Sequence, residues 1–309
     1  MPETIGVIQG GTRPAVAPFE GPYVQVLEDA LKARGLDRGT DYQFQIEYLN
    51  GNPLAEALGA LTRLKDAKAK AIVTMDALVT RIARDNGITT PIVWAVGDKQ
   101  ADAGAVRTYR APGGTMTGLT GSIGAGIARL DLFNQVLGAS KKIAVLLGPN
   151  YKMQGDDEAE YRTAAAALGV GIADVFPIKT PSDIPPLFDR AHTNGWGITL
   201  VPHSMFSLRP RALVELEQTR DVPVVYPHKR FVELGGLCSW GPDLTDLVRR
   251  SALYVERIMR GKLPGELPMQ GPIMESAINF DMAKTHTPAI NFPGWIRTMT
   301  PEINRFGTP

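Results

Sequence analysis

The glycine-rich stretch "GGTMTGLTGSIGAG", Gly113–Gly126, separates two parts of the chain that share one pattern. Short apolar runs occur on both sides of it, with segments of helical periodicity between them. The runs before it are "TIGVIQ", "YQFQIEYL", "AIVTM" and "PIVWAV", and those after it are "KIAVLLG", "GIADVFPI", "GITLVP", "VPVVYP" and "GGLCSW". Buried strands that alternate with helices are typical of βαβ units and parallel sheets. The pattern therefore predicts an α/β protein of two Rossmann-like lobes joined at the glycine-rich stretch.

Length and composition agree with two lobes of ordinary size. The chain has 309 residues, more than a single hydrophobic core usually supports. Its 33 basic and 32 acidic side chains leave a net charge of +1, so we expect no nucleic-acid partner. The single cysteine, Cys238, excludes an internal disulfide and is expected to be a small buried residue at a strand end. The first strand begins by Thr4, so we expect that any secretory leader has been removed from the mature chain.

The glycine-rich stretch lacks the residues that a nucleotide site needs. A phosphate-binding P-loop reads G-x-x-x-x-G-K-[ST], and Gly121 and Gly126 have that spacing, but Ile127 and Ala128 replace the lysine and the hydroxyl residue. The sequence "GGTRPA" after the first apolar run lacks the third glycine of a dinucleotide fingerprint. We therefore predict no cofactor, and we expect these glycines to provide backbone freedom where the chain passes between lobes.

Residue patterns for catalysis or metal binding are also missing. The histidines His192, His203, His228 and His286 lack the spacing of a zinc site, so no metal is predicted. Ser204 follows His203 directly, but no G-x-S-x-G turn exposes it as a nucleophile. A racemase that uses paired thiols would need two cysteines. No catalytic residue is predicted.

The candidate ligand-binding residues lie in the loops that follow the apolar runs, because ligands of open parallel sheets bind beyond the carboxyl ends of the strands. The aromatic candidates are Trp94, Tyr151, Tyr226 and Trp240. The polar candidates are Asp76, Asp98, Asn150, His203 and Ser204. The backbone amides of Ala77 and Leu78 begin a predicted helix, a favourable place for a carboxylate. The alternatives are that the aromatic rings serve packing and that Asp76 is only the N-cap of that helix.

Three separate segments resemble one family. "PIVWAVGDKQADAGAVRTYRAPGGTMTGLTG" resembles the P-I-V-F-x-x-x-G-D-P-V-x-x-G-L-V-x-S-x-x-x-P-G-G-N-x-T-G segment of ABC-transporter substrate-binding proteins with the type I periplasmic-binding-protein fold, which include tryptophan and tyrosine receptors. "GGLCSWGPDLTDLVRRSALYVERIMRGKLPGELP" is similar to the family's G-G-L-x-S-Y-G-x-D and Y-V-x-x-I-L-x-G segments, and "GLDRGTDYQFQIEYLNGN" to G-Y-x-E-G-x-N-x-x-I-E-Y. The resemblance covers most of residues 4–286. The chain departs from the family at Lys99, at Trp240, where tyrosine is usual, in a longer loop over 9–22, and in an extension over 291–309.

The resemblance implies a periplasmic, monomeric receptor that captures a small solute between two lobes by hinge closure and delivers it to a membrane permease. It implies three chain crossings, with Gly118, Gly241 and Pro268 as hinge residues. Lobe one then comprises residues 1–118 and 242–268, and lobe two comprises residues 119–241 and 269–309. The implied ligand is an aromatic or branched amino acid or a small carboxylate.

Carried over by position, the candidates take separate roles in the cleft. Asp76, Ala77 and Leu78 hold a carboxylate or an ammonium group, while Trp94 and Trp240 stack on an apolar or aromatic body. The lobe-two residues that complete the site are Tyr151, His203, Ser204 and Tyr226.

Two other functions share this architecture. A ligand-responsive transcription regulator needs a helix-turn-helix before the first strand, and the strand here begins by Thr4. A two-lobed racemase or isomerase that uses Asp76 or His203 is the alternative hypothesis, and the missing acid–base constellation argues against it.

Overall fold

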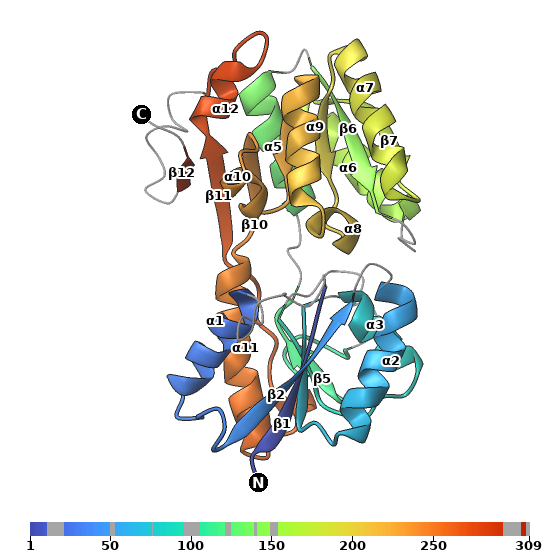
Figure 1. Ribbon diagram of the computed structural model, residues 1–309. Helices are drawn as coiled ribbons and strands as arrows, with labels where there is room; N and C mark the ends of the chain where they lie inside the picture. The colour runs from blue at the N-terminus through green and yellow to red at the C-terminus, as the bar shows by residue number, and fades with distance from the viewer. Residues whose placement is uncertain are drawn as a thin grey trace. The chain divides into compact units, whose positions relative to one another are not determined.

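The computed structural model describes residues 1–10, 22–49, 53–75, 77–95, 106–120, 125–138, 141–148, 154–292 and 304–306. The chain forms two compact α/β units (Figure 1). Unit 1 comprises Met1–Ser122 and Leu244–Ile273, and unit 2 comprises Ile123–Asp243 and Met274–Pro309. Each unit has its own sheet, in which parallel pairing dominates. The predicted fold class of two α/β lobes is therefore confirmed.

Unit 1 is a doubly wound fold. Its elements are β1 (Glu3–Gly10), α1 (Pro22–Lys32), β2 (Tyr42–Leu49), α2 (Pro53–Asp66), β3 (Ala71–Thr74), α3 (Ala77–Asp85), β4 (Ile92–Trp94), β5 (Met116–Gly118), α11 (Leu244–Met259) and the 3-10 turn η2 (Pro264–Glu266). The sheet is parallel, with the order β2-β1-β3-β4-β5. This order reverses direction beside β1, as doubly wound folds do.

Helices cover both faces of the unit 1 sheet because its strands are apolar on both sides. Ile5 and Val7 of β1 pack in the cluster that contains α1 and α11. Ile8 packs in the other cluster, with α2 and α3. Successive strand residues point to opposite faces, so a continuous apolar run serves both clusters.

Unit 2 has a larger sheet. Its elements are α5 (Ala125–Leu137), β6 (Lys142–Leu147), α6 (Gln154–Leu168), β7 (Gly171–Pro177), the 3-10 turn η1 (Pro181–Asp183), α7 (Ile184–Asn194), β8 (Gly197–Leu200), α8 (Ser204–Ser207), α9 (Pro210–Arg220), β9 (Val224–Tyr226), α10 (Arg230–Glu233), β10 (Cys238–Pro242), β11 (Met274–Asn279), α12 (Phe280–Thr285) and β12 (Asn304–Phe306). The strand order is β12-β11-β10-β9-β8-β6-β7. Only β10 and β11 pair antiparallel among the described strands.

Both faces of the unit 2 sheet are also buried. Val145 faces the cluster with α5, α6 and α12, while Leu146 faces the cluster with α7, α9 and α10. Cys238 is buried at the start of β10, the position that the sequence predicts, and burial raises the pKa of its thiol well above the usual range. Such a thiol stays protonated at neutral pH.

The unit boundaries correct the predicted lobe limits by a few residues. The Leu119 amide donates to the carbonyl oxygen of Trp94 at 2.9 Å, and the Thr120 amide donates to that of Gln270 at 2.8 Å, so both segments belong with unit 1. Strand β10 continues to Pro242, which pairs with Met274 of β11 in unit 2. Backbone pairing across these segments therefore places each boundary slightly later in the chain than predicted.

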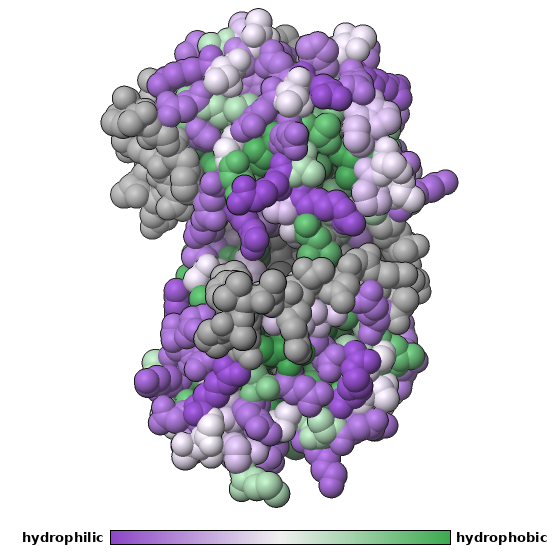
Figure 2. Space-filling model, in the orientation of Figure 1, coloured by the Kyte–Doolittle hydropathy of each residue, from purple (hydrophilic) through white to green (hydrophobic). Residues whose placement is uncertain are grey.

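The described surface is largely polar. Figure 2 shows mainly hydrophilic side chains on the viewed face, with apolar residues in small areas. The large apolar side chains that are exposed come from different elements: Met1, Leu58, Tyr109, Ile127, Leu263 and Ile273. No helix in the described part of the chain is long and apolar enough to cross a membrane.

Candidate functional site

Several candidate residues meet at the carboxyl edge of the unit 2 sheet. Strands β8, β9 and β10 are neighbours in this sheet and run parallel. His203 follows β8, Tyr226 ends β9, and the half-buried Trp240 lies near the end of β10. Arg129 of α5 reaches the same edge, where its Nη1 donates to the carbonyl oxygen of Trp240 at 3.3 Å. Polar and aromatic candidates therefore lie together at one edge of this sheet, where the strand-end rule predicts a ligand.

One ring nitrogen of His203 already has a hydrogen-bond partner. It is half-buried, and its Nδ1 accepts a hydrogen bond from the Met205 amide at 3.1 Å. The ring meets that of Phe206 edge to face, with 6.3 Å between the centroids. Ser204, the other polar candidate here, is the first residue of α8. The acceptor nitrogen of His203 is thus used inside its own loop.

Tyr226 points into the core of unit 2, which corrects the expectation that it faces a ligand. Its side chain is fully buried and stacks on Phe231, with 4.5 Å between ring centroids. Its hydroxyl donates to Glu217 Oε2 at 2.9 Å. Burial, followed by the nearby Glu217 carboxyl, raises the pKa of Tyr226 well above its usual range. The ring and hydroxyl of Tyr226 therefore serve packing.

Glu217 is a buried acid that the sequence analysis missed, because its position in α9 gave no sign of burial. It is fully buried, and its carboxyl also accepts hydrogen bonds from the amides of Val224 at 2.9 Å and Leu237 at 3.1 Å. Burial raises the pKa of Glu217 to about 8, although these donors and Tyr226 favour the charged form. The carboxyl ties α9 to the segments beside β9 and β10.

His228 cannot act as a general base at neutral pH. It lies just after β9, is 6% exposed, and its Nε2 is 3.5 Å from Ser207 Oγ. Burial, then the charges of Arg230 and Arg129, lowers the pKa of His228 to about 3. Its Nδ1 has no hydrogen-bond partner among the described residues, so no carboxylate orients the ring. A serine–histidine dyad needs a ring that takes up a proton near the working pH.

The low pKa of His228 predicts that acid weakens the fold of unit 2. The ordinary pKa is 6.5, and in the folded protein it is about 3, so between these values only the unfolded chain binds the proton. The contribution is present above pH 6.5 and is lost as the pH falls, by about 1.4 kcal/mol per pH unit. Between pH 6 and pH 4, urea unfolding should show a smaller loss of unfolding free energy for His228→Gln than for the wild type. The control is the exposed His192, because the unfolding free energy of His192→Gln should change with pH as that of the wild type does. If the unfolding free energies of all three proteins change equally with pH, the prediction is contradicted.

The unit 1 candidates are placed differently. Trp94 ends β4 and is fully buried in the core cluster with α2 and α3, so its ring packs in the interior, the alternative stated for the aromatic candidates. Ala77 and Leu78 begin α3, as predicted. The remaining candidates lie outside the described residues: Asp76, Asp98, Asn150 and Tyr151.

Two of the three predicted hinge residues lie in close backbone contacts, and the third accepts a side-chain hydrogen bond. Gly118 ends β5 with φ of +131°, and a Cβ there would lie 2.3 Å from the carbonyl oxygen of Trp94. Gly241 lies in β10 against Pro227, whose carbonyl oxygen would be 1.6 Å from an added Cβ. The carbonyl oxygen of Pro268 accepts a hydrogen bond from the Tyr254 hydroxyl of α11 at 2.9 Å. At both positions, the close approach of two backbones explains why the residue is glycine, without a role in hinge motion.

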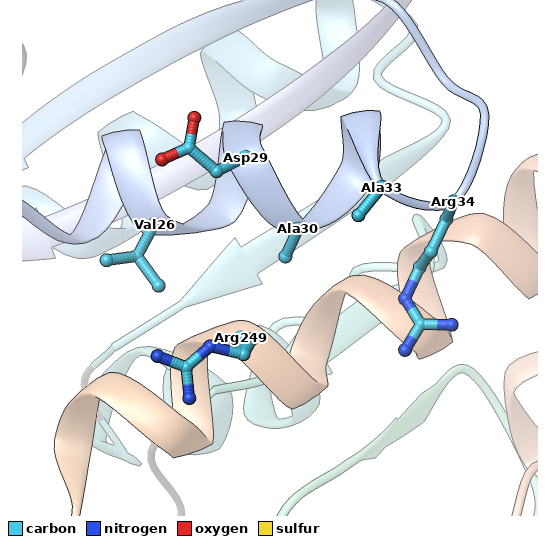
Figure 3. Close-up of a pocket in the computed structure, with 6 residues that line it drawn as sticks. All are labelled: Val26, Asp29, Ala30, Ala33, Arg34 and Arg249. Carbon is cyan, nitrogen blue, oxygen red and sulfur yellow. The ribbon is translucent and has the colours of Figure 1, made fainter.

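A groove of about 460 Å³ lies on unit 1 between α1 and α11 (Figure 3). Val26 and Ala30 point from α1 toward α11, and Arg34 and Arg249 border the groove. Asp29 accepts a hydrogen bond from Gln25 at 2.9 Å, so this acid is already partnered. The groove is open and mostly apolar, and it lies apart from the strand ends, so it lacks the convergent polar groups of a solute site.

The described residues hold no group of three potential metal ligands. The carboxyl edge of unit 2 presents a half-buried tryptophan, a half-buried histidine and a buried arginine, with a second histidine that stays neutral. This set can bind and orient a small molecule.

Comparisons with solved structures agree with the fold. A conserved domain protein from Vibrio cholerae is 21% identical, with a TM-score of 0.84 over 99% of each chain. An ABC domain from Streptococcus pneumonia in complex with L-Trp is 17% identical, with a TM-score of 0.79 over 97% of this chain and 99% of that one. A substrate-binding protein with adhesive properties from Clostridium difficile is 15% identical, with a TM-score of 0.67 over 99% of this chain and 100% of that one.

The sequence itself carries a family signature. No curated protein matches the chain. The family model described as ABC transporter substrate binding protein, however, matches residues 20–289. This match spans most of both units and includes the segments on which the resemblance was based. The chain therefore belongs to the ABC transporter substrate-binding protein family.

Proposed function

We propose that this protein is the extracytoplasmic solute receptor of an ABC importer, and that it captures its solute between the two units by hinge closure. The observation that carries the proposal is the family match over residues 20–289. Substrate-binding proteins of ABC importers bind small solutes and work with a membrane permease. His228, which stays neutral at this edge, favours binding over proton transfer there. A periplasmic location and a monomeric state are part of the proposal.

The proposed solute is an aromatic or branched amino acid or a small carboxylate. Trp240 supports this class, because it packs on the unit 2 core but is only half-buried near the end of β10, where it can cover an apolar body. The similar structure in complex with L-Trp supports it further, since a protein of the same fold binds an aromatic amino acid.

The proposed contacts come from both units. In unit 2 they are the ring of Trp240 and the α8 loop with His203 and Ser204. In unit 1, the backbone amides of Ala77 and Leu78 at the start of α3 suit a carboxylate group. The candidates outside the described residues remain in the proposal: Asp76, Asp98, Asn150 and Tyr151.

A thermal-shift and fluorescence titration with amino acids and small carboxylates tests this function. A true solute present at about 100 times its Kd should add ~2.7 kcal/mol to the stability of the protein. Trp240→Ala should weaken binding by roughly 30-fold or more, because it removes an aromatic wall.

Trp196→Ala is the matched control. Trp196 is also half-buried, but it lies at the amino end of β8 under Arg190, whose guanidinium carbon is 5.3 Å from the ring centroid. Its removal should leave the affinity unchanged. If both tryptophan variants bind as tightly as the wild type, the assignment of the unit 2 edge is wrong.

A further inference from the structure

The carboxyl edge of unit 2 contains a buried positive charge that has no counter-charge among the described residues. Arg129 lies on α5 and is 2% exposed. Its Nη1 donates to the carbonyl oxygen of Trp240 at 3.3 Å, and its Nη2 donates to the Tyr161 hydroxyl at 3.1 Å. Both partners are neutral oxygens. No described carboxylate forms an ion pair with Arg129, and its Nε has no hydrogen-bond partner among the described residues.

This arrangement is costly for the protein alone. A guanidinium carries five N–H donors and remains charged at all ordinary pH values. A buried charge is normally paired, because its loss of hydration is otherwise uncompensated. The hydrogen bonds to Trp240 and Tyr161 leave donors unused and the charge unbalanced. An anion is the missing partner.

The neighbouring groups do not supply that anion. His228 lies close enough for the charge of Arg129 to lower its pKa, which keeps the ring neutral. Lys229 forms ion pairs with the acids at the ends of β10 and β11. Its Nζ is 3.0 Å from Glu275 Oε2 and 3.9 Å from Asp243 Oδ1. The acids of this edge are therefore held by a different cation.

We propose that the solute carries a carboxylate and that Arg129 is its counter-ion in unit 2. This inference rests on the proposed receptor function and names the residue of unit 2 that pairs with the carboxylate of the proposed solute. The planar guanidinium can pair with both oxygens of a carboxylate, which a lysine cannot do. Trp240, whose carbonyl oxygen Arg129 contacts, then places an apolar wall beside the anion site.

Matched acid and amide probes test the inference. Benzoate is compared with benzamide, and L-tryptophan with L-tryptophanamide, by calorimetric titration of the full chain. The wild type should prefer the acid of at least one pair. Arg129→Gln should weaken binding of that acid by roughly 100-fold, the usual effect of truncating one partner of a buried charge pair, and the amide by less than about threefold.

Two further variants separate binding from folding. Arg129→Lys keeps the charge but loses the planar guanidinium, so its affinity for the acid should lie between those of the wild type and Arg129→Gln. If Arg129→Gln does not fold, Arg129→Lys takes its place in the comparison with the wild type. Tyr161→Phe removes the Nη2 acceptor and keeps the charge, so it should retain the preference for the acid. A purely structural role of Arg129 would change the affinities for acid and amide by the same factor.

Each remaining outcome has a definite meaning. A preference for the acid that survives in Arg129→Gln overturns the inference, as does equal binding of acid and amide by the wild type. An uncharged solute recovered from the purified protein also overturns it, but leaves the receptor function intact. If the wild type binds no small solute at all, both the inference and the proposed function fail.

Discussion

Gly241→Ala is expected to destabilise unit 2 by at least about 3 kcal/mol, because the new methyl group would overlap fixed backbone. The added Cβ would lie 1.6 Å from the carbonyl oxygen of Pro227 and 2.7 Å from its carbonyl carbon. A side chain could rotate away from such a contact, but strand β10 and the segment after β9 are held by their sheet pairing. Urea unfolding followed by circular dichroism should show an earlier transition and loss of native signal.

Gly271→Ala is the control for this substitution. Among the described residues, a Cβ at Gly271 would meet only Thr120 Oγ1, at the ordinary distance of 3.9 Å. That variant should be as stable as the wild type or slightly more so, because alanine reduces the freedom of the unfolded chain. If Gly241→Ala unfolds at the same urea concentration as Gly271→Ala, the close approach of β10 to Pro227 is wrong.

Glu217→Ala should cost about 3–5 kcal/mol of folding free energy, because it strands three buried donors. The amides of Val224 and Leu237 and the hydroxyl of Tyr226 all donate to this carboxyl at 2.9–3.1 Å. Each loses its acceptor, and the buried site cannot admit bulk water without opening the contact between α9 and the sheet. Chemical denaturation at constant pH measures the loss.

Glu215→Ala is the matched control on the same helix. Glu215 is exposed on α9, so its truncation should change stability by less than about 0.5 kcal/mol. A similar small effect for Glu217→Ala would show that the three hydrogen bonds do not hold α9 in place.

The strands with long apolar runs were predictable from sequence, and some shorter elements were not. The run "YQFQIEYL" is β2 over its full length, because alternating apolar and polar residues between turn residues are typical of a strand. Strand β5 has only three residues and ends in Gly118, so it was not separable from the glycine-rich stretch. Strand β11, "MESAIN", was missed because its first half is only partly buried.

Helix α7 was missed for a different reason. It begins with Ile184 followed by two prolines, which interrupt the helical pattern of the sequence. Proline fits the first turn of a helix, where its missing N–H would have no partner anyway. Just before it, the Asp183 carboxylate accepts hydrogen bonds from the amides of Lys179 and Thr180, which is the local signal that marks the helix start.

The strand-end rule predicts an edge of the sheet for the ligand but does not tell which side chains face it. Val225 and Tyr226 are adjacent in β9 and both buried, because both faces of the strand are covered by helices. A continuous apolar run gives no alternation from which to read the direction of Tyr226. Arg129 could not be identified as a site residue from the sequence, because it lies on a helix. Only the packing of α5 on β10 brings it to the edge of the sheet.

The central claim is that the protein binds a small solute and releases it unchanged. The most direct measurement is native mass spectrometry of the purified chain, followed by release and identification of the bound compound before and after prolonged incubation with excess of it. A receptor should carry one solute per chain, and the recovered compound should keep its mass and stereochemistry. Recovery of a converted product would contradict the claim, and so would a chain that retains no solute and binds none from the amino acid and carboxylate set.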